Sequence, residues 1–176
     1  RVFMAGEGDF AGSLVERFSA WHRANYGGCK GGNADVLLGA TALLAEIHGT
    51  TKNAIVRDKL TEIVHLVETN FAGAIGSSAL ARQLPAGNWL VDPLLANTVK
   101  QNVTRFVYQV GRLAHDIAGG ILSTLPADAD FRNDAVGGLL EKYFAGKQGF
   151  STEDKRKLCR YIEGMTSVST LVEALH

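Results

Sequence analysis

Apolar residues recur at helical spacing through most of this sequence, and glycine or proline interrupts them at only a few points. The segment 13–25 carries four such residues, which are Leu14, Val15, Phe18 and Trp21. Their spacing of i, i+1, i+4 and i+7 predicts a helix with one buried face. Glycine costs about 1 kcal/mol more than alanine inside a helix, so the pair Gly27-Gly28 is expected to end it.

Two further helical blocks follow this pair. Asn33 is a favourable N-cap for a helix over 34–49. A long periodic segment then runs over 53–83, and the turn-forming residues 85–88 (Pro-Ala-Gly-Asn) end it. The sequence therefore predicts three successive helices in its first half.

The second half is also predicted to be helical. Pro93 suits the first turn of another long helix, which weakens at Gly119-Gly120 and ends before the next proline. A short helix is expected over 135–145, and Ser151, followed by acidic residues, is a good N-cap for a last helix. No strand pattern is evident. The predicted fold is all-α, an antiparallel bundle of four long helices with shorter ones added.

Composition narrows the class of protein. The 176 residues are enough for one domain with a substantial core, and 18 Lys and Arg balance 18 Asp and Glu. This balance argues against a nucleic-acid or acidic-membrane partner. No apolar run reaches the roughly 18 residues of a membrane span, and the amino terminus lacks a secretory signal pattern. Because the chain begins at Arg1 and stops at "LVEALH", we expect it to be part of a longer protein.

The two cysteines, Cys29 and Cys159, lie 130 positions apart. This spacing makes a disulfide framework improbable and favours a reducing, cytoplasmic compartment. Cys159 has no neighbouring ligand type and is expected to pack in the core. His48, His65 and His115 occur singly on predicted helices, where surface or core-edge positions are expected.

The stretch "WHRANYGGCKGG" gathers His22, Tyr26, Cys29 and Lys30. On a continuous helix, His22 and Cys29 would lie two turns and about 10 Å apart, too far to share one zinc ion. The glycines would let the chain fold back and bring Cys29 closer to His22. A larger inorganic unit would also accept two ligands at that separation. Iron–sulfur clusters usually need four ligands. The alternative is a buried small side chain at Cys29 and a helix-end histidine at His22.

The other two polar residues of this stretch also have two readings. Tyr26 could carry a proton, and Lys30 could hold an anionic cofactor or activate a thiol. The alternatives are a packing aromatic ring and a solvated charge.

Two further places are candidates for chemistry. Glu173 and His176 stand at i, i+3 and could act as an acid–base pair on the final helix, or belong to a frayed terminus. Gly119-Gly120 would permit the close approach of a ligand such as a phosphate or a flavin, or of a second helix.

Four stretches carry a family resemblance. They are "RVFMAGEGDFAG", "WHRANYGGCKGG", "NVTRFVYQVGRLAHDIAGGILSTLPADADFR" and "LEKYF". In this order they resemble the carboxy-terminal helical half of the 4-hydroxybutyryl-CoA dehydratases (vinylacetyl-CoA Δ-isomerases). These enzymes form a branch of the 4-hydroxyphenylacetate 3-hydroxylase family, which shares the fold of the acyl-CoA dehydrogenases. The resemblance covers nearly the whole chain.

The resemblance assigns roles to the candidate residues. In the dehydratases, the pattern H-x6-C supplies two of four protein ligands of a [4Fe-4S] cluster, which implies His22 and Cys29 here; the related flavin hydroxylases lack both. Tyr26 and Lys30 match positions between cluster and flavin, and Glu173 matches a proposed catalytic base. Further roles are implied for His22, as a proton carrier, and for Gly119-Gly120, near the FAD.

The implied activity is that of an enzyme. The whole protein would convert 4-hydroxybutyryl-CoA to crotonyl-CoA and isomerise vinylacetyl-CoA by radical chemistry, as a cytoplasmic homotetramer. The remaining cluster ligands and most of the flavin site would come from a preceding domain. The alternatives are a flavin-dependent aromatic hydroxylase and a helical oligomerisation module without chemistry of its own.

Overall fold

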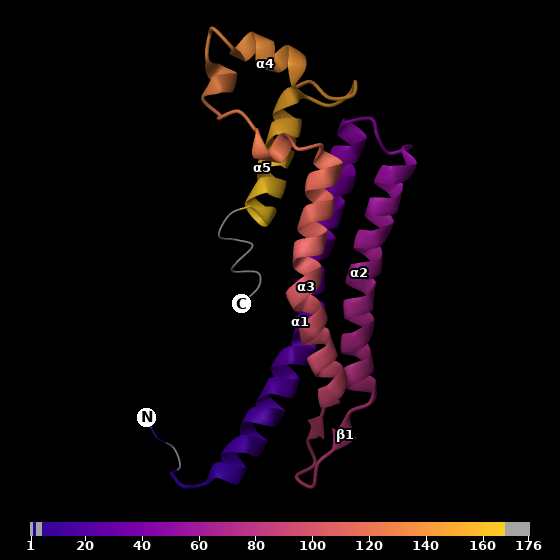
Figure 1. Cartoon of the computed structure of the whole chain (residues 1–176), viewed down its shortest axis with the longest axis vertical. Coiled ribbons are helices and arrows are strands. Elements are labelled where there is room, and N and C mark those ends of the chain that lie inside the picture. The colour runs from indigo at the N-terminus through magenta and orange to yellow at the C-terminus, as the bar shows by residue number, and fades with distance from the viewer. Residues whose placement is uncertain (1, 3–4, 168–176) are drawn as a thin grey trace. The chain divides into compact units, whose positions relative to one another are not determined.

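A computed structural model describes residue 2 and residues 5–167 of the chain (Figure 1). Helices dominate these residues, which confirms the all-α class. The elements follow in the order α1 (Gly8–Ile47), α2 (Ala54–Ala79), β1 (Arg82–Gln83), β2 (Trp89–Leu90), α3 (Pro93–Ala118), η1 (Ile121–Ser123), η2 (Asp130–Arg132), α4 (Gly137–Tyr143) and α5 (Thr152–Thr166). None of the described helices is long and apolar enough to cross a membrane.

The helix α1 is continuous over 40 residues, and this corrects the sequence prediction. Neither Gly27-Gly28 nor Asn33 interrupts it, so the first two predicted helices are one helix. The prediction of four long helices therefore becomes three, α1 to α3, with the 15-residue α5 following later.

Packing against α2 explains why α1 continues through its glycines. A Cβ atom added at Gly27 would lie 2.4 Å from Ala74 Cβ and 2.8 Å from the Asn70 carbonyl oxygen, closer than real Cβ atoms approach. Glycine at this position therefore lets the two helices approach closely. Contacts of this kind outweigh the weak helix propensity of glycine, which is a preference that tertiary packing routinely overrides.

The chain divides into two compact units, and each of the three long helices contributes to both. The first unit comprises Arg1–Gly32 and Val67–Phe106, and the second comprises Asn33–Leu66 and Val107–His176. The candidate residues His22, Tyr26, Cys29 and Lys30 all belong to the first unit.

Small residues hold the helices of the first unit together. Besides Gly27, the glycine at position 73 faces α3, where an added Cβ would be 2.9 Å from Val99 Cγ2. A small apolar cluster supports the start of α3 and the hairpin, and its buried members are Ala20, Leu90, Val91 and Ala96. Larger residues in place of Gly27 or Gly73 would therefore force these helices apart.

The two-residue strands β1 and β2 form an antiparallel hairpin that the sequence analysis did not predict. Arg82 pairs with Leu90 and Gln83 with Trp89. The intervening residues do form the predicted turn, in which Gly87 adopts a positive φ of 88°. Strands this short carry no alternating pattern that sequence inspection can detect.

The first turns of α1 expose apolar side chains that the sequence analysis expected to be buried. Figure 1 shows this part of α1, drawn in indigo, diverging from α3. Leu14, Val15, Phe18 and Trp21 are between 53% and 66% exposed, whereas Ala20 is buried. The apolar stripe of α1 thus has the predicted periodicity, but more than half of the surface of each of these side chains is exposed.

Three predictions for the second half are confirmed. Pro93 begins α3, and the Asp92 carboxylate accepts a hydrogen bond from the Leu95 backbone N–H at 2.8 Å. Ser151 caps α5, because its hydroxyl oxygen accepts a hydrogen bond from the Asp154 backbone N–H at 3.0 Å. The short helix α4 falls within the predicted range 135–145.

Candidate functional site

The candidate residues of the first unit share one side of α1. At 3.6 residues per turn, His22, Tyr26, Cys29 and Lys30 fall within about 100° of the helix circumference. The His22 and Cys29 side chains are exposed, whereas Tyr26 and Lys30 are each only 8% exposed. The structure therefore brings all four together through the helical repeat and not through a fold-back at the glycines.

The His22 imidazole and the Tyr26 phenol are hydrogen-bonded. His22 Nε2 lies 3.0 Å from the Tyr26 hydroxyl oxygen, and either group donates according to the tautomer of the histidine. The two rings meet edge to face with centroids 5.0 Å apart, and Phe18 stacks on His22 at 5.7 Å. These contacts hold the imidazole in one orientation and give it a partner with which it can exchange a proton.

Two lysines approach the Tyr26 ring. Lys100 Nζ, from α3, lies 4.2 Å from the ring centroid, and Lys30 Nζ, from α1, lies 5.6 Å from it. A second link between these helices runs from the Arg23 guanidinium, which donates a hydrogen bond to the Asn97 side-chain oxygen. The site is thus electropositive and is built from α1 and α3 together.

Lys100 belongs to this arrangement without any signal in the sequence. Lys100 lies 74 positions after Tyr26 and on another helix, and no local motif surrounds it. Only the packing of α3 against α1 reveals that its ammonium group belongs to the site.

The two cysteines have contrasting environments. Both are free thiols, as predicted, with Cys29 exposed and Cys159 completely buried in α5. Burial raises the pKa of the Cys159 thiol to about 11, partly offset by the nearby positive charges of Lys155 and Arg160. A buried thiol of this kind is unreactive, so the predicted packing role of Cys159 is confirmed.

The continuous helix decides what kind of metal group His22 and Cys29 fit. Two turns separate them by about 10 Å along the axis, so they cannot bind one metal ion together. Both are exposed on the same face, and an imidazole with a thiolate suits two corners of a larger iron–sulfur unit. Residues 5–167 contain no group of three or more His, Cys, Asp or Glu placed to hold a metal ion. Within that range, these two residues therefore do not form a complete metal site by themselves.

Gly119 and Gly120 belong to the second unit and end α3. Both adopt left-handed backbone conformations, with φ of 71° and 81°, which favour glycine. An added Cβ at either position would meet nothing within 4 Å, so close helix packing does not explain them. Their conformation explains the glycines, and an approach to a flavin is left as a prediction. The predicted pair Glu173 and His176 lies outside the described residues.

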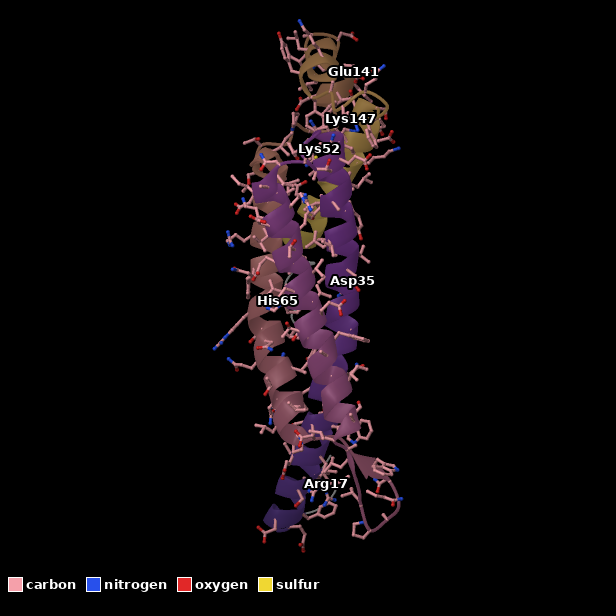
Figure 2. All side chains as sticks on the ribbon, turned by 90° about the vertical axis from the view of Figure 1, so that its right-hand side faces the viewer. Arg17, Asp35, Lys52, His65, Glu141 and Lys147 are labelled. Carbon is pink, nitrogen blue, oxygen red and sulfur yellow. The ribbon has the colours of Figure 1, made fainter. Side chains whose placement is uncertain are left out.

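The three other histidines lie at surface or core-edge positions, as predicted. His65 is exposed on α2 (Figure 2). His48 is half-buried, and burial together with the positive charge of Lys155 lowers its pKa. His115 Nε2 is hydrogen-bonded with Thr166 Oγ1 at 2.8 Å and with Ser167 Oγ at 3.1 Å, which ties the end of α5 to α3.

Comparison with known proteins identifies relatives along the whole chain. Residues 11–175 match the family described as HpaB, 4-hydroxyphenylacetate 3-hydroxylase C terminal. The chain is 43% identical to a 4-hydroxybutyryl-CoA dehydratase/vinylacetyl-CoA-Delta-isomerase from Clostridium aminobutyricum, over the whole of this chain and 38% of that protein.

Solved structures of two of these kinds of protein share the fold of this chain. An oxygen-tolerant archaeal 4-hydroxybutyryl-CoA dehydratase from N. maritimus superposes with a TM-score of 0.92 and 46% identity, over 99% of this chain and 35% of that one. The oxygenase component of 4-hydroxyphenylacetate 3-monooxygenase, solved with FAD and 4-hydroxyphenylacetate, gives a TM-score of 0.85 at 22% identity, over 99% and 37% of the two chains. The chain spans little more than a third of the length of these relatives. The match over residues 11–175 shows that the chain belongs to the 4-hydroxyphenylacetate 3-hydroxylase C-terminal family.

Proposed function

We propose that this chain is the carboxy-terminal helical part of a 4-hydroxybutyryl-CoA dehydratase that also isomerises vinylacetyl-CoA. The observation that carries the proposal is the shared face of α1, on which exposed His22 and Cys29 flank Tyr26. The 43% identity to a dehydratase of this name supports the same activity. An acyl-CoA is the proposed substrate, and a homotetramer is the proposed assembly.

The chemical difficulty of the reaction explains why such a site needs cofactors. The proton on the carbon β to the thioester is far too weakly acidic for an ordinary side-chain base. When bound, FAD would supply one-electron chemistry and a [4Fe-4S] cluster would supply a Lewis acid for the departing hydroxyl group. In the protein, side chains must hold these groups, orient the acyl chain and carry the protons.

We assign these tasks to different residues of α1. The Cys29 thiolate and the His22 imidazole are the proposed ligands of the cluster. The Tyr26 hydroxyl, hydrogen-bonded with His22 Nε2 at 3.0 Å, is a proposed proton carrier, and His22 can exchange a proton with it. Lys30, buried beside Tyr26, is proposed to orient the flavin or the substrate carbonyl.

Three further assignments rest on the family resemblance. Glu173 is a proposed catalytic base and proton carrier. Gly119 and Gly120 are proposed to lie near the flavin, where their open surroundings would leave room for a ligand.

Iron analysis of the intact protein tests the proposal. We expect Cys29→Ala to lose bound iron, sulfide and the visible absorption of the cluster, together with dehydratase activity. Cys159→Ala is the matched control, because it removes the buried thiol of α5 and should keep the iron. Iron, sulfide and activity retained in Cys29→Ala would contradict the assignment.

Two alternatives are distinguished by the same measurement. A flavin-dependent aromatic hydroxylase is favoured by the fold shared with the FAD-bound monooxygenase component, and it would contain flavin without iron. A helical oligomerisation module is favoured by the exposed apolar residues of α1, and it would bind neither. Flavin and iron in the intact protein would exclude both alternatives.

A further inference from the structure

Two ammonium groups converge on one aromatic ring in the first unit. Lys30 and Lys100 approach Tyr26 from different helices, with Nζ atoms 5.6 Å and 4.2 Å from the ring centroid. The two nitrogens can therefore be no farther apart than the sum of these distances, about 10 Å. Cation–π attraction accounts for part of this arrangement, since each cation gains about 0.5–2 kcal/mol at a ring face.

No carboxylate of the described residues balances the charges of these two lysines. Lys30 is 8% exposed and Lys100 is half-buried, and neither forms an ion pair within residues 5–167. By contrast, Lys59 and Lys157 pair with Asp116 and Glu153 at 3.3 Å and 3.4 Å. Buried lysines are rarely left unpaired, and two like charges within about 10 Å of each other repel in a partly dry site.

Lys155 shows how a single lysine can be buried without an acidic partner. Its Nζ lies 4.7 Å from the Phe144 ring centroid, and desolvation by burial lowers its pKa. A single lysine can thus pack on one ring while burial lowers its pKa. The pair at Tyr26 differs because two ammonium groups meet at one ring, beside the hydroxyl that bonds His22.

We infer that Lys30 and Lys100 form a binding site for an oxyanion of the acyl-CoA substrate, with Lys100 as a substrate-binding residue contributed by α3. The inference rests on the proposed function, because the ligand it names is the acyl-CoA substrate of that activity. An anionic oxygen beside these ammonium groups would offset their repulsion and accept a charge-assisted hydrogen bond.

Two groups of an acyl-CoA offer such an oxygen. One is a phosphate of the CoA moiety, which is charged before any reaction. The other is the thioester oxygen, which becomes negative when the α proton is removed. A phosphate contact would strengthen binding of every CoA ester, whereas a thioester contact would act mainly on the transition state.

The experiment uses the intact protein and butyryl-CoA, an ester that lacks the hydroxyl leaving group. In one arm, its dissociation constant is measured by calorimetry for the unaltered protein, Lys100→Met and Lys100→Arg. We expect Lys100→Met to weaken binding of butyryl-CoA about tenfold or more if the anion is a phosphate, and Lys100→Arg to restore most of it. Lys142→Met is the matched control, because Lys142 approaches the Tyr143 ring at 5.1 Å on α4, in the other unit, and should leave binding unchanged.

The second arm separates the two sources of the anion. Turnover of 4-hydroxybutyryl-CoA is compared with turnover of the pantetheine ester, which lacks the nucleotide phosphates. If Lys100 contacts a phosphate, Lys100→Met will raise KM for the CoA ester alone. If it contacts the thioester oxygen, Lys100→Met will lower kcat about tenfold or more for both esters with little change in KM.

Each outcome bears on the inference. Unchanged affinity and unchanged kcat in a folded Lys100→Met would overturn it. If Lys100→Met does not fold, Lys100→Gln is measured in its place by the same two readouts. If the unaltered protein neither binds butyryl-CoA nor dehydrates the hydroxy ester, the proposed function itself fails. Binding by the unaltered protein with no effect at Lys100 removes only the present inference.

Discussion

At the scale of single residues, the glycines of α1 occupy two kinds of environment that the sequence does not distinguish. Gly27 is a contact residue, since an added Cβ would be 2.4 Å from Ala74 Cβ. Gly28 and Gly31 would place an added Cβ where nothing lies within 4 Å. All three look alike in the printed chain. The neighbour that distinguishes them lies on α2, more than 40 positions away, so local propensity wrongly predicted a break here.

A substitution pair tests this difference. Gly27→Ala should destabilise the protein by about 1–3 kcal/mol, because it forces α1 and α2 apart. Gly31→Ala should instead stabilise it by up to about 1 kcal/mol through better helix propensity. Denaturant unfolding of the two variants and the unaltered protein measures both effects. Equal effects in both variants would show that Gly27 does not make the close contact.

At the scale of secondary structure, helix boundaries were predictable where the side chain that sets them is adjacent in sequence. At the start of α5, the Ser151 hydroxyl accepts a hydrogen bond from the backbone N–H three residues later. At the start of α3, the carboxylate of Asp92, next to Pro93, does the same. The hairpin β1–β2 was not predictable, because two-residue strands depend on the packing of Leu90 rather than on a pattern. The site shows the same division: α1 alone supplies four of its residues, and Lys100 enters only through helix packing.

The cap of α5 offers a test at this scale. Removing the hydroxyl that accepts from the Asp154 N–H in Ser151→Ala should cost about 0.5–2 kcal/mol of stability. Ser13→Ala, an exposed position inside α1, should change stability by less than about 0.5 kcal/mol or improve it. Thermal unfolding followed by circular dichroism compares them. A Ser151→Ala variant as stable as Ser13→Ala would mean that the cap contributes nothing.

At the scale of the whole molecule, the two units differ in how they are stabilised. The first unit relies on small residues and apolar contacts, whereas α5 in the second unit carries a group of ion pairs. Arg156 bonds both Asp128 and Glu153, and Arg160 bonds Glu163 at 2.7 Å. The guanidinium of Arg156 lowers the pKa of Asp128, and it lowers the pKa of Glu153 to about 2.

The two units should therefore respond differently to acid. A carboxyl group whose pKa is lowered by folding stabilises the folded state above its unfolded pKa and loses that contribution as pH falls through the folded value. For Glu153, this window runs from about pH 4.5 down to about pH 2. Amide hydrogen exchange should show α5 losing protection in this window before the first unit does. Arg156→Gln should abolish the difference, and equal loss of protection in both units of the unaltered protein would contradict it.

The unbroken course of α1 constrains the proposed ligands in a way that a flexible loop would not. Because no bend separates His22 from Cys29, their relative azimuth is set by the count of intervening residues. One extra residue between them would swing the thiol by about 100° around the axis, away from the imidazole. Ligation by this helix would thus tolerate no single insertion or deletion, and the six-residue interval is itself part of the site.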